Sequence, residues 1–223
     1  MFSSLDFTPF VLSFKLAFIV TILLFFIAIP LAWWLSRTKS KIKPFIEAVG
    51  ALPLVLPPSV LGFYILVIFS KNSPLGAVLS KINIELLFSF SGLVVASIIY
   101  SFPFMLQPLQ SGFESLNRAM IEQSFIAGKS SLITLFKVAL PNIKPSLLTA
   151  LVVTFAHTVG EFGVVLMVGG SIPDKTKVAS VAIYEMVETM DYKNAHIYSA
   201  IMLTISFLVL LSVYLFNRRV KNG

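Results

Sequence analysis

The hydrophobic pattern of this chain consists of long apolar segments separated by short polar ones. A helix needs about 20 mostly apolar residues to cross the hydrocarbon core of a bilayer. The segments that meet this requirement are 11–35, 45–69, 86–106, 146–168 and 195–216. The pattern therefore predicts an all-α integral membrane protein, with five transmembrane helices in a single membrane domain over residues 1–223.

A sixth apolar segment, 178–190, is too short to cross the membrane. It contains Glu185 and Glu188. At about 1.5 Å per residue it would cover only about 20 Å of a hydrocarbon core that is about 30 Å thick. We therefore expect a short amphipathic helix that lies at the membrane surface, with a re-entrant helix as the alternative.

The basic residues indicate the orientation of the chain, because Lys and Arg gather in cytoplasmic loops. With five spans and an external N-terminus, the inside receives eleven of the 17 basic residues. These are Arg37, Lys39, Lys41, Lys43, Arg118, Lys129, Lys137, Lys144, Arg218, Arg219 and Lys221. A sixth span over 178–190 would move the C-terminal cluster outside and Lys193 inside, and the division would fall to nine against eight. We therefore expect an external N-terminus, a cytoplasmic C-terminus and an external helix at 178–190.

Composition supports a membrane protein and excludes several kinds of site. Hydrophobic residues make up 57% of the chain and charged residues 12%, with a mean hydropathy of +0.92, whereas soluble domains carry about 25% charged residues. The chain has no cysteine and two histidines, which argues against disulfides and metal centres. We therefore expect no metal and no cofactor. We also expect no nucleic acid partner, because the basic residues are spread over three loops.

Motifs of membrane-embedded enzymes are not evident. The chain contains neither H-E-x-x-H nor G-x-S-x-G, so we expect no catalytic residue. An intramembrane protease could pair His157 with a serine, but the spacing of the many serines selects none. Such an enzyme remains the alternative from a different functional class.

Prolines interrupt the second span in the stretch LPLVLPPSVLG, residues 52–62. Each proline removes a helical hydrogen bond, so a freed carbonyl must find another partner or a water-filled cavity. A single proline is explained by a kink that improves helix packing. This cluster is denser than a kink needs, which favours the interpretation that it lines a pathway through the membrane. The residues that we expect to line or gate it are Pro57, Pro58, Ser59, Thr158, Gly160, Glu161 and Gly163.

His157 and Glu161 lie four residues apart in the fourth span, which predicts that they share one helical face. Ionisable groups inside a membrane are costly and are often functional, which favours a proton relay or an ion site. The alternative is a polar pair that holds spans together or faces a wet vestibule. Between these readings we favour a structural or gating role for the pair.

The loop at 107–145 is the longest internal connection, and a loop of this length is expected to contain helices and a function. Its Gly128-Lys129-Ser130 resembles the end of a phosphate-binding P-loop, but Gln123 stands where that motif needs its first glycine. We expect instead a helix with Phe113, Leu116, Met120 and Phe125 on one face, a break at Gly128, and a second helix. Ser130 or Ser131 caps that second helix, and Pro141 stops it. Such a unit could dock into a groove of a partner or lie on the membrane surface.

This loop resembles the cytoplasmic signature of ABC importer permease subunits, E-A-A-x-x-x-G followed after nine residues by I-x-L-P. Glu122-Gln123-Ser124, Gly128 and Val138-Ala139-Leu140-Pro141 have the same spacing, with Gln123 and Ser124 replacing the two alanines and Val138 replacing isoleucine. The resemblance implies a coupling helix that sits in a cleft of a cytoplasmic ATPase, where the nucleotide is bound. The coupling residues that it implies are Glu122, Gln123, Ser124, Ala127, Gly128, Leu140 and Pro141.

Two further stretches, LPLVLPPSVLGFYIL and GEFGVVLMVGGSIPDKTKVASVAIY, resemble the molybdate permease subgroup, and the second is shared more loosely with sulfate permeases. This resemblance implies a permease in the bacterial cytoplasmic membrane, in contact with lipid, that carries molybdate or, alternatively, sulfate or tungstate. It also implies a homodimer, two copies of the ATPase and an external molybdate-binding protein.

Overall fold

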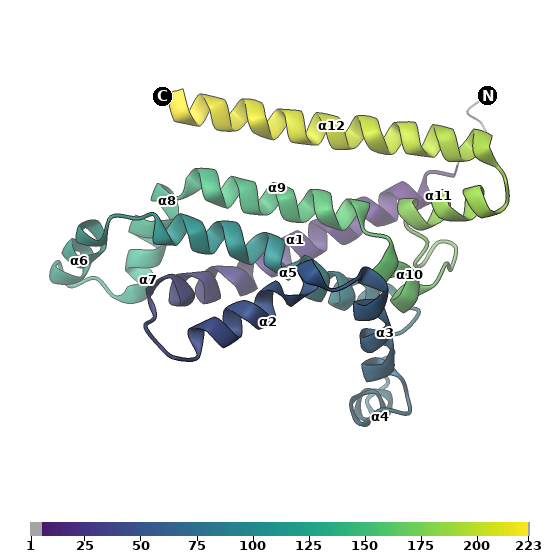
Figure 1. Ribbon diagram of the computed structural model, residues 1–223, viewed down its shortest axis with the longest axis horizontal. Helices are drawn as coiled ribbons and strands as arrows, with labels where there is room; N and C mark the ends of the chain where they lie inside the picture. The colour runs from purple at the N-terminus through teal and green to yellow at the C-terminus, as the bar shows by residue number, and fades with distance from the viewer. Residues whose placement is uncertain (1–5, 223) are drawn as a thin grey trace.

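The computed structural model describes residues 6–222, and all regular structure in that range is helical (Figure 1). The helices are α1 (Thr8–Arg37), α2 (Lys43–Val55), α3 (Pro58–Phe69), α4 (Pro74–Lys81), α5 (Phe90–Glu114), α6 (Arg118–Ile126), α7 (Ser131–Thr134), α8 (Leu140–Asn142), α9 (Lys144–Gly160), α10 (Gly163–Gly169), α11 (Ala179–Glu188) and α12 (Tyr192–Asn222). A π-helical turn, η1 (Leu135–Ala139), joins α7 to α8. The basic side chains of Arg218, Arg219 and Lys221 lie outside the part of the chain whose side chains are described.

Three helices are long and apolar enough to cross a membrane, namely α1, α5 and the Tyr192–Leu211 part of α12. Two further pairs meet the same criterion only across a bend, α2 with α3 at 113° and Ser131–Asn142 with α9 at 83°. The described chain therefore has three to five candidate spans, and the predicted all-helical membrane fold is confirmed at that level.

The centre of the bundle is formed by α1, α5 and α9, which pack along one another. On α1, Leu16, Val20 and Leu24 are buried, and their spacing of four residues places them on one face. Phe18 and Phe26 on the remaining surface of α1 are exposed. A helix that is apolar on all sides, with one face packed against protein, is typical of a membrane span that contacts lipid on its other faces.

Segment 45–69 is divided into two helices at Leu56 and Pro57. Both residues have extended backbone, with ψ of 136°, because a residue that precedes a proline is disfavoured in the α region. In Figure 1, α3 leaves the bundle sideways after α2 and leads to the short helix α4. The predicted interruption by Pro57 and Pro58 is confirmed, whereas a straight crossing by this segment is not observed.

Segment 146–168 is also divided, and our expectation of a continuous helix there was wrong. Helix α9 ends at Gly160, Glu161 has an extended ψ of 132°, and α10 begins at Gly163. Glu161 therefore lies outside the helix that carries His157, and the predicted shared helical face does not exist. No proline causes this break, so the pattern of residues alone did not reveal it.

The short helix expected at 178–190 is present as α11, beside the start of α12 (Figure 1). Its buried face consists of Ala179, Val181 and Ala182. On its polar side, Glu185 forms an ion pair of 2.5 Å with Lys177, which holds the helix to the preceding loop. The amphipathic character predicted for this segment is thus visible in its packing.

Candidate functional site

The loop between α5 and α9 begins with a sharp change of direction. Helix α5 extends to Glu114, eight residues beyond the expected end of the third span, and Ser115 is its C-cap. The side chain of Asn117 then accepts a hydrogen bond of 2.9 Å from the amide of Ala119 and so caps α6. The single helix expected through residues 113–126 was therefore wrong, because the chain bends at 115–117.

Gly128 ends α6 in a left-handed conformation with φ of +75°. The amide of Gly128 donates to the carbonyl of Phe125 at 2.9 Å, and the amide of Lys129 donates to the carbonyl of Ser124 at 3.1 Å. These two bonds make a Schellman motif, in which glycine is preferred because it has no Cβ. The predicted break at Gly128 is confirmed, and the backbone geometry explains why a glycine is needed there.

The chain after Gly128 forms the second helical half of the loop. The hydroxyl of Ser130 accepts a bond of 3.4 Å from the amide of Ile133, so the expected serine cap is confirmed for Ser130. The helical run continues through η1 and α8 and ends before Ile143, whereas we expected it to stop at Pro141. Pro141 lies in the first turn of α8, where a missing N–H group is tolerated.

The two halves of the loop are joined by one buried polar contact. The hydroxyls of Ser124 in α6 and Thr134 in α7 lie 2.9 Å apart, and both side chains are buried. Ser124 is one of the residues that depart from the family signature, and this bond gives it a structural role. The sequence did not identify Thr134, because its partner lies across the Gly128 turn.

The outer surface of this loop is unusually apolar for a segment at the end of the molecule. Ile126 is 86% exposed, Leu132 67% and Phe136 61%, and Figure 1 shows α6 projecting beyond the ends of the long helices. Glu122, Gln123, Ala127, Gly128 and Pro141 are exposed on the same loop, while Ser124 is buried and Leu140 is half-buried. An exposed apolar patch with a polar surround is typical of a protein interaction site.

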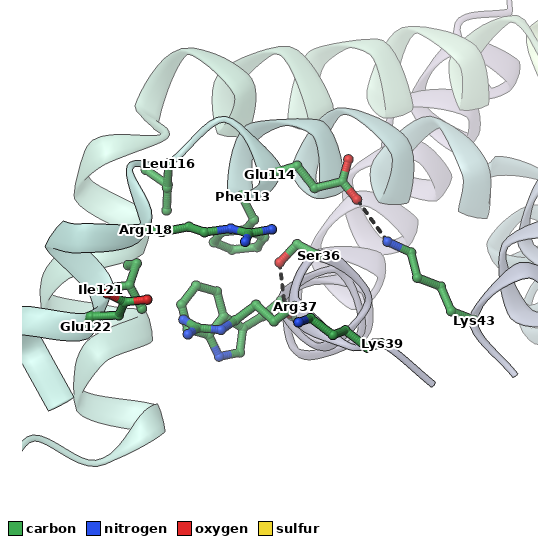
Figure 2. A pocket seen from close by; sticks show the side chains of 11 residues that line it. Ser36, Arg37, Lys39, Lys43, Phe113, Glu114, Leu116, Arg118, Ile121 and Glu122 are labelled. Carbon is green, nitrogen blue, oxygen red and sulfur yellow. Dashed lines mark hydrogen bonds and ion pairs between the residues drawn. The ribbon is translucent and has the colours of Figure 1, made fainter. Parts of the chain in front are cut away.

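A cavity of about 490 Å³ separates the end of α1 from α6, with Arg37, Lys39, Lys43 and Arg118 among its lining residues (Figure 2). Four basic side chains therefore surround the space between these two helices.

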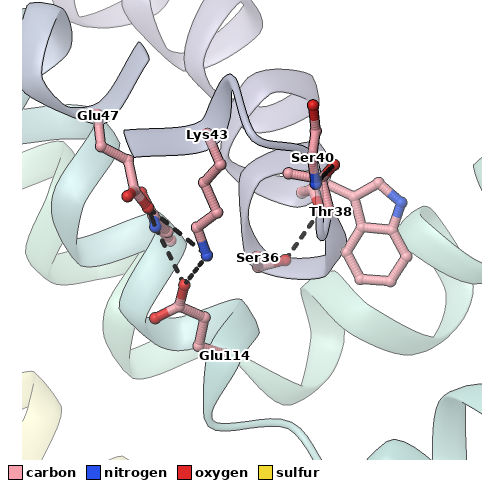
Figure 3. A network of polar contacts seen from close by, with 8 residues as sticks. Ser36, Thr38, Ser40, Lys43, Glu47 and Glu114 are labelled. Atoms are coloured by element: carbon pink, nitrogen blue, oxygen red, sulfur yellow. Dashed lines mark hydrogen bonds and ion pairs between the residues drawn. The ribbon is translucent and has the colours of Figure 1, made fainter. Parts of the chain in front are cut away.

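Lys43 also belongs to a network of polar contacts (Figure 3). Its ammonium group lies 3.3 Å from the carboxylate of Glu114 and 3.6 Å from that of Glu47. Gln110 donates to both carboxylates, at 2.5 Å to Glu47 and 3.0 Å to Glu114. This network fixes the start of α2 to the end of α5.

A second cavity, of about 600 Å³, lies where the two divided segments meet. Five of the predicted pathway residues line it, namely Pro58, Ser59, Gly160, Glu161 and Gly163. Of the other two, Pro57 is exposed and directly precedes Pro58 of the lining. Thr158 is buried away from the cavity, and its hydroxyl lies 2.9 Å from the hydroxyl of Ser101. The structure thus brings most of the predicted pathway residues together at the two helix breaks.

The two breaks touch each other through Gly163. A Cβ atom built on Gly163 would lie only 2.8 Å from Cβ of Pro58, which is closer than such atoms approach in proteins. Glycine at this position therefore allows α10 to pack against α3. The contact places the proline cluster of one divided segment directly at the break of the other.

Glu161 is the most unusual residue of this cavity. It is 4% exposed, and among the described residues neither of its carboxylate oxygens has a hydrogen-bond partner. Ser97 of α5 is a neighbour of the carboxyl group, and Ser97 also lacks a hydrogen bond. The backbone of Glu161 is held in place by Ser180 of α11, whose hydroxyl donates to the Glu161 carbonyl at 2.6 Å.

His157 lines the same cavity but has a separate set of partners. Its Nδ1 atom lies 3.0 Å from the hydroxyl of Ser101. Its ring stacks on Phe104 with a centroid distance of 3.8 Å and lies 4.8 Å from the ring of Tyr100. The sequence could not select these partners, because they lie more than 50 positions earlier in the chain.

The pair of Ser101 and His157 does not have the arrangement of a protease nucleophile. Ser101 is completely buried, so a peptide could not reach its hydroxyl. The second partner of that hydroxyl is Thr158. The polar groups between α5 and α9 therefore hold two membrane helices together.

Comparison with known proteins identifies the class and the family. The family described as binding-protein-dependent transport system inner membrane component matches residues 25–222. The molybdenum transport system permease protein of Azotobacter vinelandii is 47% identical over 95% of this chain and 94% of its own length. The "Probable sulfate transport system permease protein" of Prototheca wickerhamii is 31% identical over 88% of this chain and 77% of its own.

The fold is shared with a solved structure as well. The crystal structure of a bacterial ABC transporter involved in the import of the acidic polysaccharide alginate superposes with a TM-score of 0.75 at 17% identity. The match covers 95% of this chain and 79% of the other. This superposition shows that the two chains share one helical fold, and the family match over residues 25–222 defines the class as an inner membrane component of a transport system.

The chain belongs to the family of binding-protein-dependent transport system inner membrane components. It is a multi-pass permease subunit of an ABC importer and is not itself an enzyme. The alternative of an intramembrane protease is therefore wrong. Such a permease works with an ATPase and with a substrate-binding protein, as the resemblance in the sequence implied.

Proposed function

We propose that this permease carries molybdate across the bacterial cytoplasmic membrane, driven by ATP hydrolysis on a partner. The observation that supports the substrate is the 47% identity to a molybdenum permease over nearly the full length of both chains. The sulfate permeases are less similar, at about 30% identity. Sulfate and tungstate are the competing substrates.

Transport by purified components tests this substrate. The permease is placed in proteoliposomes with its partner ATPase and external binding protein, and ATP-dependent uptake of labelled molybdate is measured. We expect excess unlabelled sulfate to leave this uptake unchanged. Competition by excess tungstate shows whether molybdate and tungstate share the path. Uptake of sulfate in preference to molybdate would reassign the permease to sulfate.

The assembly that we propose has two copies of the permease, two copies of the ATPase and one external molybdate-binding protein. The loop between α5 and α9 docks on the ATPase through Glu122, Gln123, Ser124, Ala127, Gly128, Leu140 and Pro141. Its exposed apolar residues support this role, since a helix in a groove is anchored by such side chains. The N-terminus is external, and the C-terminus and the docking loop are cytoplasmic.

The translocation path or its gate lies at the two helix breaks, with Pro57, Pro58, Ser59, Thr158, Gly160, Glu161 and Gly163. The cavity of about 600 Å³ at this point supports the proposal. Among the described residues, its lining contains the hydroxyl groups of Ser59 and Tyr100, His157 and the carboxyl group of Glu161, but no lysine or arginine, so an oxyanion would be held weakly enough to leave. Glu161 acts in the structure or gating of the path.

A further inference from the structure

Trp33, in the last turns of α1, joins this helix to two other elements. Its side chain is 8% exposed. The indole Nε1 atom donates a hydrogen bond of 3.2 Å to the hydroxyl of Ser131 in α7. The ring also packs edge-on against Phe113 of α5, with a centroid distance of 5.3 Å.

Arg37 lies one turn further along α1 and adds a contact to α6. Its guanidinium group is 4.5 Å from the centroid of the Trp33 ring and 5.2 Å from that of Phe125. A cation within about 6 Å of an aromatic ring is attracted to its face. Figure 2 shows Arg37 and Glu122 at the same cavity, so a carboxylate of α6 also lies toward this cation.

Together these two residues contact the loop on both sides of the Gly128 turn, at Phe125 before it and at Ser131 after it. The buried hydrogen bond between Ser124 and Thr134 ties these two halves of the loop, the α6–α7 unit, to each other. The other connections of this unit are the backbone bends at 115–117 and at Ile143, and the apolar side chains of Ile121 and Leu135, which are buried in the same core cluster as residues of α1 and α5.

We infer that Trp33 and Arg37 form a clamp that passes movement of the α6–α7 unit to α1, and that both are positioning residues for the coupling of ATP hydrolysis to transport. The inference rests on the proposed docking of this loop on the ATPase. Without the clamp, only the packing of apolar side chains, which is non-directional, would hold the loop to the spans, and a displaced loop could bend at 115–117 and at Ile143 without moving α1 by the same amount. With it, α1 must follow, and α1 packs along α5 and α9, which carry Tyr100 and His157 of the pathway cavity.

The test compares clamp variants with neighbours that make none of these contacts. The variants are W33F, which keeps a ring but removes the N–H donor, R37Q, which removes the cation, and the double variant. Trp34 is 40% exposed, so W34F is the control for the aromatic substitution. Lys39 lines the same cavity as Arg37, so K39Q is the control for the loss of charge.

Molybdate uptake and ATP hydrolysis are measured together in proteoliposomes that contain the binding protein and the ATPase. In the double variant we expect uptake per ATP hydrolysed to fall about tenfold, within the usual range of coupling between two sites. The ATPase still co-purifies and still hydrolyses ATP. W34F and K39Q retain the wild-type ratio.

Two outcomes would overturn the clamp while leaving the proposed function in place. One is a wild-type uptake-to-hydrolysis ratio in the double variant. The other is an equal loss of uptake and hydrolysis together with loss of the ATPase, which would show that the contacts only maintain the docking surface. Absence of ATP-dependent uptake in the wild-type assembly would overturn the proposed function, and the clamp with it.

A distance measurement keeps the inference testable if transport is lost for other reasons. The chain has no cysteine, so spin labels at K41C and K129C report only on the loop after α1 and on the Gly128 turn. Both positions are exposed. We expect a narrow distance distribution in the background of wild-type Trp33 and Arg37, and a broad one in the double variant. Identical distributions would contradict the clamp.

Discussion

The backbone conformation at Gly128 makes a prediction at the scale of a single residue. A Cβ atom there would meet no other atom within 4 Å, so the difficulty for any other residue is the φ of +75°. This conformation costs L-residues about 1–2 kcal/mol. We expect G128V to abolish molybdate uptake, because the angle between α6 and α7 changes, while the thermal unfolding of the membrane helices stays the same.

The matched control is G128N, since asparagine adopts the left-handed region more readily than other residues with a Cβ. It should retain most of the uptake in the same proteoliposome assay. Equal loss of uptake in both variants would mean that the small size of glycine, and not its backbone freedom, is what the ATPase requires.

Sequence reasoning succeeded at residues whose role is local. The break at Gly128 and the cap at Ser130 follow from positions a few residues apart, and both are present. It failed for contacts that depend on how distant segments fold together. His157 and Ser101 are bonded across 56 positions, and Trp33 and Ser131 across 98, so neither pair carries a signal in the order of the residues.

At the scale of elements, the packing of α3 against α10 depends on the absence of a side chain at Gly163. We expect G163A to force these helices apart, because its Cβ would lie 2.8 Å from that of Pro58. Overpacking of this kind costs about 1–3 kcal/mol. Thermal unfolding in detergent should show a lower midpoint for this variant.

Gly160 supplies the control for that experiment. It lines the same cavity, but a Cβ atom at this position would meet nothing within 4 Å. G160A should therefore unfold at the wild-type temperature. A similar destabilisation by both substitutions would indicate that the cavity tolerates no added methyl group, whatever the packing of α3 and α10.

The helix breaks show why elements could be predicted only in part. Pro57 and Pro58 predicted the break between α2 and α3. By contrast, α5 contains two prolines, Pro103 and Pro108, and is not broken. A membrane helix tolerates proline when neighbouring groups satisfy the freed backbone. The break after Gly160 contains no proline and depends on tertiary contacts, among them the hydrogen bond from Ser180.

At the scale of the whole molecule, the position of α11 decides the number of spans. Its ten residues cover about 15 Å, half the thickness of a bilayer core. If α11 lies on the external surface, Lys193 at the start of α12 is external. If it crosses the membrane, Lys193 is cytoplasmic and the C-terminus lies outside.

Cysteine labelling in intact cells distinguishes these arrangements, because the chain has no cysteine of its own. Lys175 and Lys193 flank α11, Lys129 lies in the docking loop, and all three are exposed. We expect a membrane-impermeant maleimide to label K175C and K193C from outside and K129C only after lysis. The reason is the charge distribution, which keeps most basic loops inside when α11 does not cross. Protection of K193C together with labelling of K175C would require a sixth crossing and would move the C-terminus to the outside.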